Sequence, residues 1–149
     1  QMCIRDRITG AIASLKGPLH GGANEEVMHM MNKIKKPENA LKWINNALKN
    51  KDVVMGFGHR VYKSGDSRVP TMRKYFGKVA KIKKDKKFEK IYDIVERVMI
   101  KRKDIHPNVD YPTGPTYHLM GFDTDFFTPI FVISRITGWS AHILSLIHI

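Results

Sequence analysis

Three segments broken by glycine or proline carry the side chains of this sequence that are best placed for chemistry. In the first, Gly17–Asn24, two glycines directly after His20 remove neighbouring side chains, and a helical pattern begins immediately afterwards. The positive end of a helix disfavours the imidazolium form of histidine. We therefore expect His20 to be a neutral hydrogen-bond donor to a developing oxyanion. A structural histidine in a tight turn is the alternative interpretation.

The second segment, Gly56–Arg68, places His59 among three cationic side chains. Backbone N–H groups beside Gly56 and Gly58 can hold a phosphate or the edge of an adenine. Arg68 can bind a carboxylate through two parallel hydrogen bonds. The segment therefore predicts a binding site for an anionic ligand.

The third segment supplies Asp110, between Val109 and Tyr111. Partial burial among these neighbours would raise the pKa of the Asp110 carboxyl into the range that suits a general base. An aspartate that only caps a helix is the alternative interpretation.

The composition predicts a folded soluble protein. The chain has 149 residues, of which 42% are hydrophobic, and contains neither a membrane-length apolar run nor an apolar leader at its start. The single cysteine, Cys3, excludes an internal disulfide and argues against a thiolate metal site, as in a reducing compartment. The histidines lack the spacing of metal ligands. We expect a cytoplasmic protein with no metal.

The formal net charge of +12 favours anionic partners, either nucleic acid or phosphorylated ligands. Much of this charge lies in Lys78–Lys87, where Val79 and Ile82 recur at helical spacing and no aromatic residues are interleaved for base stacking. We interpret the run as a solvated helix face. A basic nucleic-acid-binding module is kept as an alternative function.

Apolar residues recur at spacings of three and four along most of the chain, which predicts an all-α fold. Asn24 is a possible N-cap, followed by two glutamates. Prolines disrupt helices, so we expect His106–Pro115 to be irregular. We expect the last helix to be buried through Phe131, Val132 and Ile136. The predicted helices span residues 24–35, 37–50, 69–82, 88–103, 116–120 and 128–143, with the apolar stripes in the core.

Four motifs in this order resemble the citrate synthase family, from about Ile8 to Ile143. They are Gly-Pro-Leu-His-Gly-Gly-Ala-Asn, Gly-Phe-Gly-His-Arg-Val-Tyr, Pro-Asn-Val-Asp-Tyr and Phe-Thr-Pro-Ile-Phe-Val-Ile-Ser-Arg-Ile-Thr-Gly-Trp. The resemblance implies a multihelical acyltransferase of the tricarboxylic acid cycle that condenses acetyl-CoA with oxaloacetate to citrate and CoA. The alternative within the family is a 2-methylcitrate synthase, which uses propionyl-CoA.

The resemblance also implies a role for each candidate residue. His20 would stabilise the enol of acetyl-CoA, Asp110 would remove the methyl proton, and His59 would protonate the ketone oxygen of oxaloacetate. Arg68 and Arg135 would pair with the carboxylates of oxaloacetate.

Coenzyme A would bind as a substrate along one loop, and the resemblance implies no cofactor besides it. Lys63 would lie near a phosphate. Relatives read Asp-Pro-Arg where this chain reads Asp66-Ser67-Arg68, so we expect a less rigid turn there. The expected contacts to CoA are Val53, Val54, Gly56, Gly58 and Lys63.

The resemblance further implies a homodimer and a division into domains. Residues 22–121 would form the small CoA-binding domain, while 8–21 and 122–144 would belong to the large domain. Residues 1–7 and 145–149 do not continue the family pattern and are interpreted as non-native ends. The chain is thus expected to be a fragment with negligible activity of its own and with exposed apolar faces.

Overall fold

The structure, a computed structural model, describes residues 2–147 and is all-α over that range. Its only β pairing there is an isolated antiparallel bridge between Phe57 and Pro107. The predicted fold class is confirmed. The elements are α1 (Met2–Leu15), α2 (Ala23–Ile34), α3 (Pro37–Asn50), α4 (Val69–Lys83), α5 (Lys87–Lys103), α6 (Asp110–Met120), the 3-10 helix η1 (Thr124–Phe126) and α7 (Phe127–Ile147).

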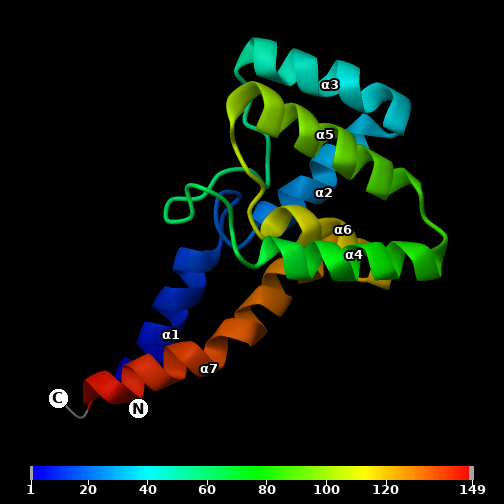
Figure 1. Cartoon of the computed structure of the whole chain (residues 1–149). Coiled ribbons are helices and arrows are strands. Elements are labelled where there is room, and N and C mark those ends of the chain that lie inside the picture. Colours follow the sequence, from blue (N-terminus) through cyan, green and yellow to red (C-terminus); the bar gives the residue numbers. More distant parts are fainter. Residues whose placement is uncertain (1, 148–149) are drawn as a thin grey trace.

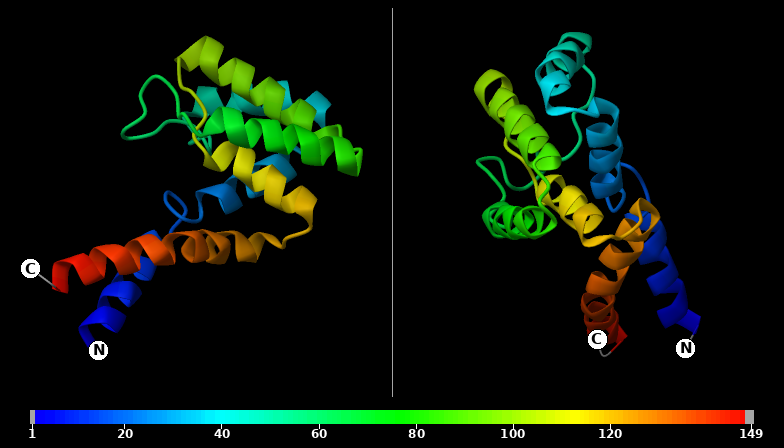
Figure 2. Two further views of the ribbon diagram at one scale, coloured as in Figure 1. Left: turned by 60° about the horizontal axis from the view of Figure 1, so that its bottom comes forward. Right: turned by 90° about the vertical axis from the view of Figure 1, so that its right-hand side faces the viewer.

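The helices form two parts, which we call the helical body (α2 to α6) and the terminal pair (α1 and α7) (Figure 1). In the body, α6 packs against α2 and α4, and α3 packs against α5. The terminal pair lies side by side and projects away from the body, with both chain ends at its far tip (Figure 2).

The apolar stripes predicted for α2, α3 and α5 form the core of the body, as expected. Two tyrosines occupy its centre. The ring centroids of Tyr92 and Tyr111 are 4.3 Å apart, and the Tyr111 hydroxyl donates a 3.0 Å hydrogen bond to the Tyr92 carbonyl oxygen. This contact joins α5 to α6 from inside the core.

The prediction that His106–Pro115 is irregular is wrong for its second half, because α6 begins at Asp110 and runs through both prolines. Pro112 lies in the first turn, where a backbone N–H has no intrahelical partner in any case. Pro115 removes one interior hydrogen bond, but tight packing on α2 compensates. A Cβ on Gly114 would lie only 2.7 Å from the carbonyl oxygen of Asn24.

Asn24 does not cap α2, contrary to prediction. The N-cap is Gly22, the helix starts at Ala23, and the Asn24 side chain is fully buried without a hydrogen-bond partner. Two glycines before the helix let the chain enter the turn without a side-chain cap. The Asn24 backbone lies at the α2–α6 contact, next to Gly114.

Helix α7 is less buried than predicted. Phe131, Val132 and Ile136 are half-buried, and Ile133 is 71% exposed. The physical reason is that, within the described residues, α7 packs mainly on α1, α2 and η1, and reaches α6 only near its start, where Phe127 lies against Tyr117. The expected exposed apolar faces are therefore present on the terminal pair.

The basic run Lys78–Lys87 is not one helix. Lys84 ends α4 in the left-handed conformation (φ 53°), and α5 begins at Lys87 after a short turn. The lysines of the run are exposed, in agreement with a solvated surface.

No helix within residues 2–147 is both long and apolar enough to cross a membrane. In the same range, no group of three or more histidine, cysteine, aspartate or glutamate side chains could hold a metal ion. The proposed non-native ends lie partly outside the described residues, at positions 1 and 148–149, while residues 2–7 and 145–147 continue α1 and α7 as helix.

Candidate active site

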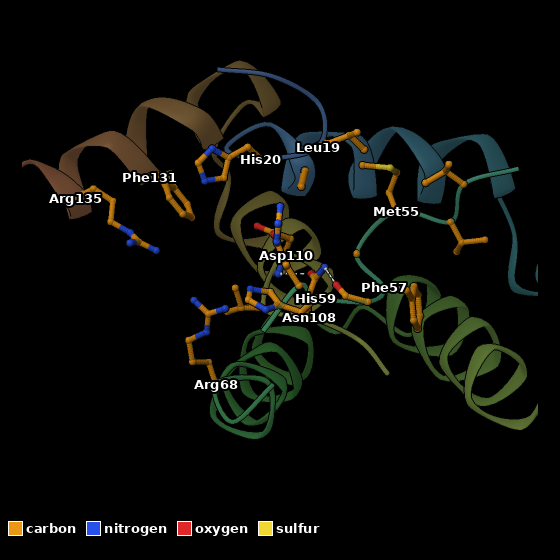
Figure 3. Close-up of a pocket in the computed structure, with 17 residues that line it drawn as sticks. Leu19, His20, Met55, Phe57, His59, Arg68, Asn108, Asp110, Phe131 and Arg135 are labelled. Carbon is orange, nitrogen blue, oxygen red and sulfur yellow. Dashed lines mark hydrogen bonds between the residues drawn. The ribbon is translucent and has the colours of Figure 1, made fainter. Parts of the chain in front are cut away.

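The three segments singled out by sequence border one cavity of about 470 Å³ (Figure 3). His20 reaches it from the turn before α2, Asp110 from the start of α6, and His59 from the loop between α3 and α4. Arg68 and Arg135 lie together at one end of the close-up. The structure thus brings together all five residues expected to act on the substrates.

Most of the expected CoA contacts border the same cavity, namely Val53, Val54, Gly56 and Gly58. Lys63 does not. It lines an adjacent cavity of about 320 Å³ on another side of His59, together with Asp104 and His106.

The glycine loop is held in place by the segment that precedes α6. Gly58 N–H donates to the His106 carbonyl oxygen and Asn108 N–H donates to the Gly56 carbonyl oxygen, both at 2.9 Å. The Asn108 amide nitrogen donates to the Gly58 carbonyl oxygen at 2.8 Å. These bonds join residues about fifty positions apart and fix His59 relative to Asp110.

Gly56 is required by this arrangement. Its φ is +83°, and a Cβ at this position would lie 2.8 Å from both the Tyr111 Cβ and the Val27 Cγ2 atoms. Only glycine combines this conformation with so close an approach of the loop to the core.

Asp110 is the first residue of α6, and its side chain caps nothing. Its N–H donates to the Asn108 side-chain oxygen at 3.0 Å. Burial raises the pKa of the Asp110 carboxyl to about 6, against the opposing effect of the Arg68 charge. This is the range predicted for a general base at neutral pH.

The orientation of His59 determines its tautomer. Its Nδ1 atom accepts hydrogen bonds from the N–H groups of Val61 and Tyr62, both at 3.1 Å. The neutral ring must then carry its proton on Nε2. His59 is therefore a donor through Nε2, as its expected role requires.

His20 is exposed and lies 3.0 Å through Nδ1 from the Ser14 carbonyl oxygen. A carbonyl oxygen can only accept, so the proton of the neutral ring is on Nδ1. In the structure the Nδ1 proton of a neutral His20 is therefore already engaged by Ser14, so the predicted donation to an oxyanion requires that this contact be given up.

The carboxylate that Arg68 holds is the protein's own Asp66, which sequence analysis did not anticipate. Arg68 Nε donates to Asp66 Oδ1 at 2.9 Å, and Nη2 donates to Oδ2 at 2.7 Å. The backbone N–H of Val109 also donates to Oδ2, at 3.1 Å. One edge of the guanidinium is thus occupied, which leaves the Nη1/Nη2 edge for a ligand.

Asp66 is only 4% exposed, and hydrogen bonding to Arg68 lowers the pKa of its carboxyl. Its position between Arg68 and Val109 also ties the loop to the start of α6. The sequence signal that could have found it is its spacing of two residues from Arg68 in Asp-Ser-Arg.

Arg135 is contributed by α7 and not by the body. Its guanidinium lies 5.0 Å from the ring centroid of Phe131, one turn earlier on the same helix. Phe131 also lines the cavity, on the side of His20 (Figure 3). Sequence analysis had assigned Phe131 only to the core.

Taken together, the site is a cavity in an all-α fold that holds a carboxyl with a raised pKa, two histidines and two arginines. Such a set suits proton transfer at a ligand that carries carboxylates. This combination of groups is typical of an enzyme that carries out acid–base chemistry on an anionic ligand.

The chain belongs to the citrate synthase family, because the model of the family "Citrate synthase, C-terminal domain" matches residues 4–148. It is 60% identical over 137 residues to 2-methylcitrate synthase 2 of Corynebacterium glutamicum, covering 92% of this chain and 36% of that protein. It is 52% identical over 144 residues to a citrate synthase of Mycolicibacterium smegmatis, covering 97% of this chain and 38% of that protein.

Among solved structures, the citrate synthase of the archaeon Thermoplasma acidophilum superimposes with a TM-score of 0.84 at 40% identity, covering 94% of this chain and 39% of that one. That structure is a ternary complex with carboxymethyl coenzyme A and oxaloacetate. The chain therefore spans little more than a third of the length of the relatives that it matches.

Proposed function

We propose that this chain carries the catalytic residues of an enzyme that condenses acetyl-CoA with oxaloacetate and releases citrate and CoA. The observation that supports it most is the cavity in which Asp110, with its raised pKa, lies with His20 and His59. The complex of the Thermoplasma relative with oxaloacetate and a CoA derivative supports the same substrates.

The first step is removal of a proton from the thioester methyl group. A thioester methyl is a very weak acid, so a carboxylate can deprotonate it only if the enolate oxygen is stabilised at the same time. Asp110 takes the proton, and His20 donates a hydrogen bond to the enolate oxygen. The raised pKa of Asp110 makes it a stronger base than an ordinary aspartate, while much of it is still ionised at neutral pH.

In the second step, the enolate carbon attacks the ketone carbon of oxaloacetate. The carbonyl π electrons move to the ketone oxygen, which takes a proton from His59 Nε2 as the carbon–carbon bond forms. Water then hydrolyses the thioester of the product, which releases CoA and citrate.

Two arginines hold the carboxylates of oxaloacetate. Arg68 offers the guanidinium edge that Asp66 leaves free, and Arg135 approaches from α7. Two cations at fixed positions suit a dicarboxylate better than a monocarboxylate.

Coenzyme A binds along the loop Val53–Gly58, whose backbone N–H and carbonyl groups can meet the adenine edge. Lys63, in the adjacent cavity, is near enough to the loop to reach a phosphate of the same ligand. No cofactor or metal takes part in this scheme.

A second candidate reaction is the condensation of propionyl-CoA with oxaloacetate to 2-methylcitrate, by the same residues. The identities favour it, since the 2-methylcitrate synthases of C. glutamicum and Mycobacterium tuberculosis are 53–60% identical to this chain. The two reactions differ only in one methyl group on the reacting carbon.

We further propose that residues 22–121 are the small CoA-binding domain, that 8–21 and 122–144 belong to a large domain, and that the parent enzyme is a cytoplasmic homodimer. The separation of the helical body from the terminal pair supports the domain division (Figure 2).

The test uses a hybrid enzyme, in which this chain replaces the matched segment of the C. glutamicum 2-methylcitrate synthase 2. Release of CoA is followed with acetyl-CoA or propionyl-CoA, each with and without oxaloacetate. We expect oxaloacetate-dependent release, and the larger kcat/KM identifies the acyl group. A folded hybrid that releases no CoA from either thioester would overturn the proposed function.

A further inference from the structure

Glu25 joins the helical body to the terminal pair. It lies in the first turn of α2 and accepts a 2.9 Å hydrogen bond from the backbone N–H of Thr128, in the first turn of α7. The Thr128 hydroxyl donates to the same carboxylate oxygen. The contact connects residues 103 positions apart in the sequence.

The chemistry of this contact favours a well-defined geometry. The N–H groups in the first turn of a helix have no intrahelical partner, and the end of the helix carries partial positive charge. A carboxylate that accepts from such an N–H forms a charge-assisted bond, stronger than a neutral one. Glu25 thus acts on α7 as a capping residue supplied by another helix.

The two helices joined by Glu25 carry different parts of the site. Helix α2 begins just after His20, while α7 carries Arg135. Thr128, Phe131 and Arg135 stand at positions i, i+3 and i+7, so they share one face of α7. Phe131 and Arg135 both border the cavity.

The position of Arg135 depends on the direction of α7. Seven residues separate it from Thr128, which is about 10 Å along a helix axis, so a tilt of about 10° at Thr128 would move Arg135 by about 2 Å. Within the described residues, Arg135 makes no ion pair, and its guanidinium stacks on Phe131 of its own helix. Its place is therefore set by how α7 is held.

Phe127 supplies the other anchor at this end of α7. It is fully buried, with its ring centroid 5.4 Å from that of Tyr117. Apolar burial is non-directional, whereas hydrogen bonds require alignment of donor and acceptor. The Glu25 contact consequently fixes the direction in which α7 leaves the body.

We propose that Glu25 is a positioning residue, which acts through Thr128 to direct α7 so that Arg135 reaches the substrate dicarboxylate. The kinetic part of this inference rests on the proposed function, but the structural part does not. The matched control is Glu26, the next residue, which is also half-buried and whose one side-chain polar contact among the described residues is to His29, at 3.4 Å.

The structural part is tested by amide hydrogen exchange of the chain itself. In the wild type, the Thr128 amide should be protected. Glu25→Ala should raise its exchange rate by about tenfold or more, while Glu26→Ala leaves it unchanged. Equal exchange of this amide in the wild type and Glu25→Ala would overturn the proposal, whatever the activity.

The kinetic part is tested in the hybrid enzyme. Glu25→Ala should raise the KM for oxaloacetate by about tenfold or more, because small displacements of a binding group are costly, with the KM for the acyl-CoA within about twofold of wild type. Glu25→Gln keeps an acceptor oxygen and should restore most of the loss. If the KM values for oxaloacetate and for the acyl-CoA rose equally, or if Glu25→Gln did not restore the KM for oxaloacetate, Glu25 would have only a general structural role and the proposal would be overturned.

A double variant separates this contact from other effects of Glu25. Thr128→Val removes the hydroxyl but keeps the backbone N–H, so its effect should be smaller than that of Glu25→Ala. The combination should lose no more than Glu25→Ala alone, and additive losses would show that the two side chains act independently. An unmodified hybrid without activity would overturn the proposed function only, since the exchange experiment decides the role of Glu25.

Discussion

The helical body and the terminal pair hold their shares of the site in different ways. In the body, hydrogen bonds between distant segments fix His59, Arg68 and Asp110. The terminal pair contributes Arg135, whose guanidinium stacks on Phe131 of its own helix and, within residues 2–147, makes no hydrogen bond to the body. One part of the site is thus built into the body, while the other depends on the orientation of a helix.

Apolar side chains are also more deeply buried in the body than in the terminal pair. Core residues of the body such as Phe76 and Val95 are 0% exposed, whereas Ile133 and Leu146 of α7 are 71% and 59% exposed. Several large apolar side chains of α7 are therefore not covered by the rest of the described residues. The comparison teaches that the body fixes its share of the site through several contacts between distant segments, while the direction of α7 depends on the contacts of Glu25 and Phe127 at its start.

The largest expected effect comes from removing Asp110, the base that we propose in the body. Asp110→Ala in the hybrid enzyme should lower kcat by about 10³-fold, the usual contribution of a general base, with little change in the KM for oxaloacetate. Steady-state CoA release measures both quantities. A loss of less than about tenfold would show that Asp110 is not the base.

A second prediction compares glycines of the two parts. Gly56→Ala forces a Cβ to within 2.8 Å of core atoms at a φ of +83°, and should destabilise the chain by about 3 kcal/mol. Gly138→Ala, in α7, meets nothing within 4 Å and should stabilise it by about 0.5 to 1 kcal/mol. Urea unfolding of both variants measures the difference, and equal effects would contradict the contrast between body and pair.

The third prediction concerns the ion pair within the body. Asp66→Asn keeps the size of the side chain but removes the charge that binds Arg68, and should cost about 2 kcal/mol of unfolding free energy at pH 7. The pKa of Asp66 is lower in the folded than in the unfolded chain. The ion pair therefore stabilises the wild type fully above the pKa of the unfolded chain, and this stabilisation is lost as the pH falls through the pKa of the folded chain. The difference between the two proteins should therefore shrink below about pH 4.

Ser67→Ala is the control for this variant, because Ser67 is exposed between the two charged residues. It should leave the unfolding free energy unchanged at every pH. A constant difference between wild type and Asp66→Asn from pH 7 to pH 3 would contradict the assigned role of the Asp66 charge.

The last prediction is a gain in stability at Asp110, the proposed base. Burial raises the pKa of Asp110 to about 6 in the folded state. Above that pH the ionised carboxylate therefore destabilises the folded state. Asp110→Asn should therefore raise the unfolding free energy by about 1 to 2 kcal/mol at pH 8, and by less at pH 4. Thermal unfolding at the two pH values measures it, and destabilisation at pH 8 would contradict the cause assigned to the pKa shift.

The helices of the body could be predicted from the sequence because each buries one stripe of apolar residues. Val27, Met31 and Ile91 recur at helical spacing and are buried as expected. The pattern failed at α6, where Pro112 and Pro115 indicated a loop and packing against α2 overrode them. It also failed at α7, because periodicity predicts that a face is apolar but not that another helix covers it.

His20, His59 and Asp110 could be found from the sequence because glycines and prolines mark the segments that carry or precede them, whereas Arg135 lies within a helix and was expected only from the family resemblance. Glu25 could not be found, since only the fold brings its partner Thr128 close, and the same holds for the contact of Asp66 with Val109, although Arg68 is only two residues away. A carboxylate on a loop or in the first turn of a helix has ordinary local explanations, such as solvation or a favourable helix end. Its true partner becomes visible only when the distances are known.

The pH dependence of kcat/KM for the acyl-CoA, measured in the hybrid enzyme with saturating oxaloacetate, tests the central claim most directly. If Asp110 is the general base with the pKa that its burial produces, kcat/KM should rise about tenfold per pH unit at low pH and level off above about pH 6. A flat profile between pH 5 and pH 8 would contradict the assignment of Asp110 as the base.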